Sequence, residues 1–155
     1  VAVYKFYDWN LPPGDETFGL IRADGSKRPA FDAWAMVIQQ FKGVKQGKIA
    51  RTEHAEAVEL TLADDSLLYI LWARTAADVN LTAAVSNNPV MLMDQYGHDL
   101  KPVLNAQNQL TLTLKGARCD KKDGCAVGGN VQLIHTSGAK LQEITSNGTL
   151  EMKFE

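Results

Sequence analysis

The stretch FGLIRADGSKRPAFDAWAMVIQQFKG, residues 18–43, predicts a turn followed by one amphipathic helix. Asp24 and Gly25 form a dipeptide that is typical of a tight turn. We expect the helix to begin near Pro29, because a proline in the first turn loses no hydrogen bond, and to stop at Gly43. Its apolar residues recur at steps of three and four positions and form one stripe: Phe31, Trp34, Val37, Ile38 and Phe41.

Residues 1–9, VAVYKFYDW, precede this segment and carry apolar side chains on both faces of an extended chain. That pattern favours a strand buried on both sides, as in a parallel sheet. Residues 10–19 hold two prolines and Gly14 without periodicity, which is typical of a loop. Strand, loop and helix together make half of a β/α repeat.

The rest of the chain shows no helical pattern and is expected to form strands. Residues 55–63 alternate, with Val58, Leu60 and Leu62 expected to point inward, and Asp64–Asp65 turns the chain into an apolar strand. The further strand candidates are 66–73, 78–85, 89–97, 109–116, 130–138 and a hairpin across Asn147–Gly148. About eight short strands in roughly 110 residues predict a mainly β fold, an antiparallel β-sandwich of immunoglobulin-like or similar type.

Composition limits the classes of partner. The 155 residues carry a formal net charge of −2, which argues against a nucleic-acid or anionic-membrane partner. No apolar run approaches the roughly 18 residues of a membrane span. The chain opens on Val1, without Met or a signal-peptide pattern, directly in an apolar strand. We therefore expect a processed or cut piece of a longer protein.

The two cysteines, Cys119 and Cys125, lie in the segment CDKKDGC. They are either two free thiols in a loop or a small disulfide loop, and we expect the disulfide, which indicates a secreted or extracytoplasmic protein. Closing so short a loop would stabilise the fold by about 2 kcal/mol. No histidine pair lies beside them at ligand spacing, so we expect neither a metal nor a cofactor.

The order of these segments resembles the C-terminal end of a retaining glycoside hydrolase with a (β/α)8 barrel, of the β-xylosidase and α-iduronidase type among cellulase-like barrels. The likeness follows the pattern Gly-Leu-x-x-x-Asp-Gly-x-x-Arg/Lys-Pro-Ala-Phe/Tyr, which stands here as Gly19, Leu20, Asp24, Gly25, Arg28, Pro29, Ala30 and Phe31. The stretches VMLMDQYGHDL and GGNVQLIHT are similar to later strands of such proteins. The resemblance implies that residues 1–43 are the last strand-loop-helix unit of a barrel and 44–155 an accessory β-sandwich.

The resemblance also implies that catalysis needs residues outside this chain. Such enzymes take their acid/base from the fourth barrel strand and their nucleophile from the seventh, and retaining hydrolysis needs two carboxyl groups about 5 Å apart. We therefore expect no catalytic residue here and no activity of the chain alone. Asp8 and Trp9 would end a barrel strand, where active sites gather, so they are the candidates for substrate contact in an intact enzyme. Asp15 and Glu16 are expected to be solvated loop charges.

The expected partners are the remainder of the barrel, carbohydrate, or a second copy that associates through residues 1–43. The alternative is a stand-alone carbohydrate-binding β-sandwich module. Its aromatic side chains would be Tyr69, Trp72, Tyr96 and Phe154. Tyr69 and Trp72 are three positions apart and point to opposite faces, so only one could line a platform. We expect Trp34 in the core and Trp72 in the core or at a domain interface.

Overall fold

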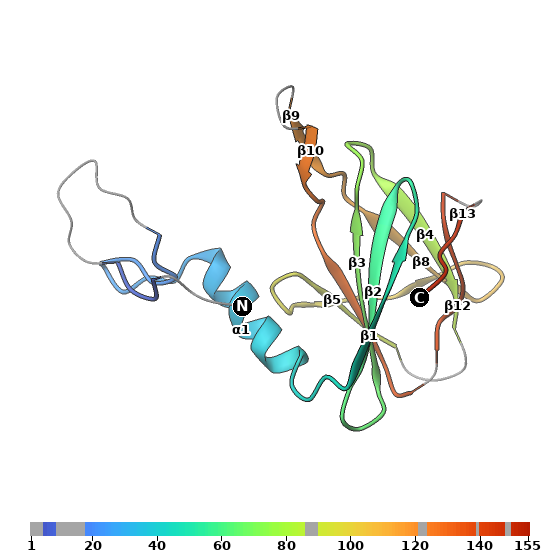
Figure 1. The fold of residues 1–155 in the computed structure, drawn as a ribbon, viewed down its shortest axis with the longest axis horizontal. Helices are drawn as coiled ribbons and strands as arrows, with labels where there is room; N and C mark the ends of the chain where they lie inside the picture. Colours follow the sequence, from blue (N-terminus) through green and yellow to red (C-terminus); the bar gives the residue numbers. More distant parts are fainter. Residues whose placement is uncertain (1–4, 9–17, 86–89, 121–123, 139, 148–149) are drawn as a thin grey trace.

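The structure is a computed structural model that describes residues 5–8, 18–85, 90–120, 124–138, 140–147 and 150–155. Within them the fold is mainly β, with one helix, α1 (Pro29–Gln40), two larger antiparallel sheets and a short hairpin (Figure 1). We call the part from residue 46 onward the two-sheet body. In the described part, no helix has the length and hydropathy that a membrane crossing requires.

Each of the larger sheets is wholly antiparallel. The first sheet runs, in spatial order, β1 (Gln46–Arg51), β2 (Ala55–Thr61), β3 (Leu67–Ala73), β11 (Gln132–Thr136), β5 (Val90–Asp94) and β6 (Asp99–Leu100). The second runs β13 (Leu150–Glu151), β12 (Gln142–Ser146), β4 (Val79–Ala84), β8 (Gln109–Leu114) and β7 (Val103–Leu104). The separate hairpin pairs β9 (Arg118–Asp120) with β10 (Gly124–Val127).

The main core lies between the two larger sheets. Strand β3 points Tyr69 and Leu71 into it, while Leu68 and Trp72 point to the other face, as the two-residue period of a strand requires. The Tyr69 ring is fully buried and packs edge-on against Phe154, with ring centroids 5.8 Å apart. Burial raises the pKa of Tyr69 far above its usual range, while its hydroxyl accepts a hydrogen bond from the backbone N–H of Leu141.

A second apolar cluster lies on the outer face of the first sheet, where α1 covers it. Its buried members are Met36, Leu60, Leu62, Leu68, Met93 and Leu133. The predicted alternation of β2 is therefore real, but the predicted orientation is wrong. Leu60 and Leu62 face the helix, whereas Ala55 and Ala57 face the second sheet. Both faces of β2 are covered, so apolar residues alone could not tell which one meets the main core.

Helix α1 begins at Pro29, as predicted, and ends at Gln40, shortly before Gly43, which has a φ of 76°. Two residues of its predicted stripe, Val37 and Phe41, pack against the cluster on the first sheet, but the most buried residue of the helix lies outside the stripe. Met36, outside the stripe, is 7% exposed, whereas Ile38 within it is 55% exposed. Trp34, expected in the core, is only half-buried and packs edge-on against Phe6.

The predicted strands of the body are present with small shifts of their ends. The expected count of about eight is too low, because thirteen strands are assigned within the described residues. The additional ones are β1 and the short strands β6, β7, β9 and β10. Asp65 and Asn147 have φ angles of 64° and 53°, as the predicted turns require. Of the predicted first strand, residues 1–4 and Trp9 lie outside the described residues, and Tyr7 forms a single parallel bridge with Ile21.

Candidate functional site

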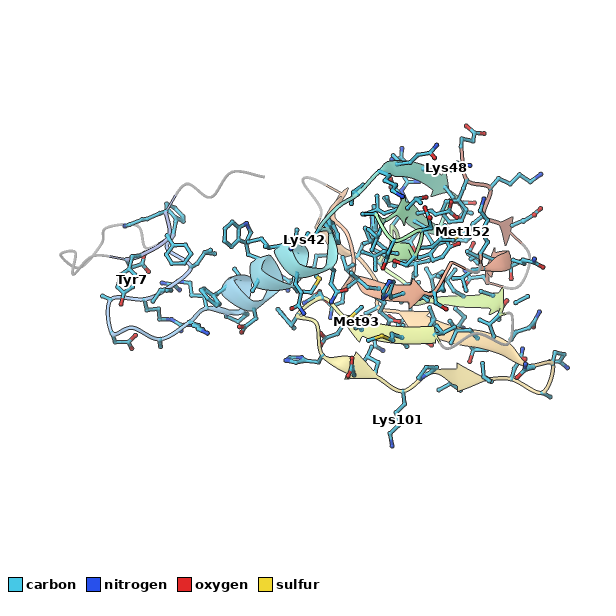
Figure 2. The ribbon with its side chains drawn as sticks, turned by 90° about the horizontal axis from the view of Figure 1, so that it is seen from below. Tyr7, Lys42, Lys48, Met93, Lys101 and Met152 are labelled. Carbon is cyan, nitrogen blue, oxygen red and sulfur yellow. The ribbon has the colours of Figure 1, made fainter. Side chains whose placement is uncertain are left out.

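The segment that carries the sequence pattern projects away from the two-sheet body, with α1 joining the two (Figures 1 and 2). We call residues 5–8 and 18–41 the N-terminal unit. Two backbone hydrogen bonds connect its parts: Asp8 N–H donates to the carbonyl of Ile21 at 2.8 Å, and Ile21 N–H donates to that of Phe6 at 3.0 Å. Arg28 N–H then donates to the carbonyl of Leu20 at 2.9 Å, which leads the chain into the helix.

Asp8, a predicted substrate contact, is 3% exposed at the centre of this unit. Its Oδ1 accepts a hydrogen bond from the Gly19 N–H at 2.7 Å, and its Oδ2 accepts one from Arg28 Nη2 at 2.8 Å. Lys5 Nζ lies 3.8 Å from Oδ1. The Arg28 hydrogen bond, helped by the Gly19 N–H and opposed by burial, holds the pKa of Asp8 below its ordinary value. Asp8 is thus an ionised carboxylate whose two oxygens are both engaged by the chain itself.

The residues of the sequence pattern explain this arrangement. A Cβ on Gly19 would lie 2.6 Å from the backbone nitrogen of Asp8, so only glycine allows the close approach. Asp24 Oδ1 accepts a hydrogen bond from the Ser26 N–H at 2.9 Å, and Gly25 has a φ of 83°. Together they form the predicted turn, which reverses the chain so that the Arg28 side chain lies beside Asp8.

The N-terminal unit exposes several large apolar side chains. Three aromatic side chains in its non-helical part, Phe6, Tyr7 and Phe18, are 48%, 49% and 61% exposed. Ile38 on α1 is also exposed, at 55%. We call these four residues the exposed apolar surface. Large apolar side chains grouped on one projecting unit are typical of an interaction site.

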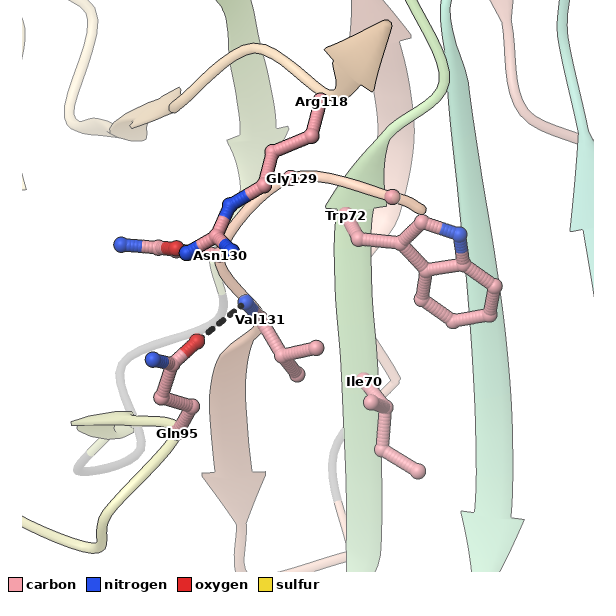
Figure 3. A pocket seen from close by; sticks show the side chains of 8 residues that line it. Ile70, Trp72, Gln95, Arg118, Gly129, Asn130 and Val131 are labelled. Atoms are coloured by element: carbon pink, nitrogen blue, oxygen red, sulfur yellow. Dashed lines mark hydrogen bonds between the residues drawn. The ribbon is translucent and has the colours of Figure 1, made fainter. Parts of the chain in front are cut away.

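The body carries a second candidate, an open cleft of about 510 Å³ on the outer face of the first sheet (Figure 3). We call it the Trp72 cleft. It is lined by Ile70, Trp72, Gln95, Arg118, Gly128, Gly129, Asn130 and Val131. Trp72 is half-buried here and is not part of the main core, so of the two expected positions, the core and a domain interface, only the second stays a prediction. No sequence pattern indicated the cleft, because its described lining residues come from four separate segments.

The other predicted site residues fall partly outside the described structure. Trp9, Asp15 and Glu16 are not among the described residues. Strands β9 and β10 place the backbones of Cys119 and Cys125 in one hairpin, but their side chains lie outside the described part, so the disulfide remains a prediction. Among the described residues, no three His, Cys, Asp or Glu side chains come together as a potential metal site.

Comparison with known proteins returned no family model, no curated protein and no solved structure that matches this chain. The two candidate surfaces are therefore interpreted from their geometry.

Proposed function

We propose that this chain is the C-terminal part of a glycoside hydrolase of the (β/α)8-barrel type. The N-terminal unit would be the last strand-loop-helix unit of the barrel. The two-sheet body would be a non-catalytic accessory β-sandwich, with immunoglobulin-like or similar strand order, that covers and stabilises one flank of the barrel. The chain would be inactive by itself, because in enzymes of this type the two catalytic carboxylates belong to earlier strands of the barrel.

The observation that carries this proposal is that α1 has two different contact faces. Met36 packs into the cluster on the first sheet. Phe31 and Trp34 instead pack edge-on against Phe6, with ring centroids 6.1 Å and 6.4 Å away. Successive residues of a helix are about 100° apart, so Ile38 lies about 200° round the helix from Met36. A helix of the outer ring of a barrel packs on the strands with one face, which leaves the opposite face free to contact a flanking domain.

The exposed apolar surface supports the same proposal. In a barrel, neighbouring strands and helices would cover Phe6, Tyr7 and Ile38. Without those neighbours, the surface would be covered by another copy of the chain. The alternative of a stand-alone carbohydrate-binding module receives less support, because Tyr69 and Phe154 are occupied in the core and do not form a platform with Trp72.

The gene region ahead of the codon for Val1 tests the proposal. We expect it to encode roughly 200 to 400 residues of alternating strands and helices, with a glutamate at the end of a late strand. The longer protein should hydrolyse an aryl β-xyloside or a related glycoside, whereas residues 1–155 should not. An upstream sequence without alternating strands and helices would refute the proposal.

A test on the present chain uses light scattering after size exclusion. We expect concentration-dependent self-association that is reduced by the double substitution Tyr7→Ser and Ile38→Ser. The control is Lys101→Ser, at an exposed position on the connection between β6 and β7. A wild-type chain that stays monomeric at high concentration while the N-terminal unit remains folded would contradict the need for a covering partner.

A further inference from the structure

The Trp72 cleft lies on the part of the first sheet that α1 leaves uncovered. We propose that it binds a saccharide ring that carries a carboxylate, that is, an acidic sugar of the uronic-acid class. Trp72 would contact the apolar C–H face of the ring, and Arg118 would pair with the carboxylate. The inference goes beyond the proposed function and does not rest on it, since the lining residues all belong to the two-sheet body.

The size and lining of the cleft suit a small ligand. Its volume of about 510 Å³ lies within the range of roughly 300–1,000 Å³ that is usual for ligand pockets. Figure 3 shows Trp72 and Ile70 on one side, Arg118 and Gln95 on the other, and Val131 between them. An apolar floor with a few polar groups at its edge can both bury a ring and fix its orientation.

The Trp72 ring is held in place by the adjoining backbone. A Cβ on Gly128 would lie 2.7 Å from Cδ1 and 3.3 Å from Nε1 of the indole, so glycine allows this segment to pass directly against the ring edge. The Gly129 N–H donates a hydrogen bond to the carbonyl of Ala73 at 3.1 Å, which anchors the segment to β3. Because the ring is already positioned, a ligand would lose little affinity to ordering it.

Arg118 supplies a positive charge that none of the described residues neutralises. The other four arginines, Arg22, Arg28, Arg51 and Arg74, each donate to a hydroxyl, carbonyl or carboxylate oxygen. The side chain of Arg118 is exposed, and its guanidinium has no ion pair or hydrogen bond with any residue that the structure describes. A guanidinium binds a carboxylate through two parallel hydrogen bonds, which favours an acidic ligand over a neutral one.

The amide side chains add donors for sugar hydroxyls. Gln95 Oε1 accepts a hydrogen bond from the Val131 N–H at 3.3 Å, which orients the side chain (Figure 3). Its Nε2 then remains as a donor, and the exposed amide of Asn130 lies at the same edge. A nucleotide could also stack on Trp72. It is less favoured, because a phosphate is usually held by several cations or backbone N–H groups, and Arg118 is the one cationic residue among the described residues of the lining.

The test is a titration of the 15N-labelled chain with three probes, followed by NMR. The probes are a xylo-oligosaccharide with one glucuronic acid substituent, the unsubstituted oligosaccharide of the same length, and adenosine monophosphate. We expect the acidic oligosaccharide to shift the indole N–H signal of Trp72, assigned with Trp72→Phe, and to bind about tenfold or more tightly than the neutral one. The Trp34 signal should not move.

Two substitutions complete the test. Arg118→Gln should weaken binding of the acidic oligosaccharide about tenfold or more and abolish the preference over the neutral one. Lys101→Gln, with the same change of charge at an exposed position outside the lining, should leave affinity unchanged. The proposal is overturned if no oligosaccharide binds at millimolar concentration, if Arg118→Gln keeps the preference, or if adenosine monophosphate binds more tightly.

Discussion

Replacing Met36 by alanine should detach the helix from the first sheet without unfolding the sheets. Met36 is the one residue of α1 that is fully buried in the cluster between helix and sheet. The substitution removes three heavy atoms, worth about 2 kcal/mol of transfer free energy, and leaves a cavity that adds to the loss. Because the cluster lies at the outer face of the sheet, the cavity can partly collapse. Alanine also has a higher helix propensity than methionine, by a few tenths of a kcal/mol. We therefore expect a net loss of about 2 kcal/mol.

Amide hydrogen exchange separates this local effect from global unfolding. A loss of about 2 kcal/mol corresponds to about 30-fold faster exchange of the amides of α1. Amides of β3 and β8, in the main core, should keep their wild-type protection. Ile38→Ala is the matched control, because Ile38 is 55% exposed on the opposite side of the helix and its truncation should change stability by less than about 0.5 kcal/mol. Equal effects of the two substitutions, or equal loss of protection in β3, would refute the account of how α1 is docked.

Three further predictions concern the turn on which α1 rests, the buried carboxylate and the cysteine hairpin. Gly97 has a φ of +84°, and a Cβ added there would lie 3.1 Å from Met36 Cγ. Gly97→Ala should therefore lower the free energy of unfolding in urea by about 1–2 kcal/mol, and by less when Met36 is also replaced by alanine. The pKa of Asp8 is lower in the folded chain than in the unfolded one. The ionised carboxylate therefore stabilises the fold at pH values above the ordinary aspartate pKa, near 4, and this contribution is lost as the pH falls through the lower pKa of the folded state. Thermal melts of wild type and Asp8→Asn should therefore differ at pH 7 and converge in acid. Iodoacetamide should label Cys119 and Cys125 only after reduction, and reduction should destabilise the hairpin by about 2 kcal/mol.

The turn and the start of the helix could be predicted because local backbone chemistry determines them. Gly25 has the left-handed backbone of the expected turn, and Pro29 is the first helical residue. The hairpin at Asp65 was predictable for the same reason, since a short polar turn between two apolar strands leaves few other conformations. The body strands followed from alternation, which is strong where one or both faces are buried.

Contacts between distant segments could not be predicted from such patterns. Asp8 was placed at the mouth of a barrel strand, but nothing local indicated that Gly19 and Arg28 would both bind its carboxylate. The orientation of β2 was missed because alanine, a weak marker of burial, occupies its inner face at Ala55 and Ala57. A pattern of large apolar residues identifies a buried face but does not say which neighbouring element covers it.

The contacts of α1 have a consequence for the proposed assembly. Because Met36 lies against both the cluster and the Gly97 turn, the helix is fixed to the first sheet near one end of β5. The side of the helix that carries Phe31 and Trp34 therefore faces a defined direction relative to the body, and the proposed barrel, if built on that side, would have one orientation available to it. Substitutions at Met36 or Gly97 should loosen the barrel from the body without touching either interior. In the proposed assembly, the helix rather than the sheets would determine where the two-sheet body lies on the barrel.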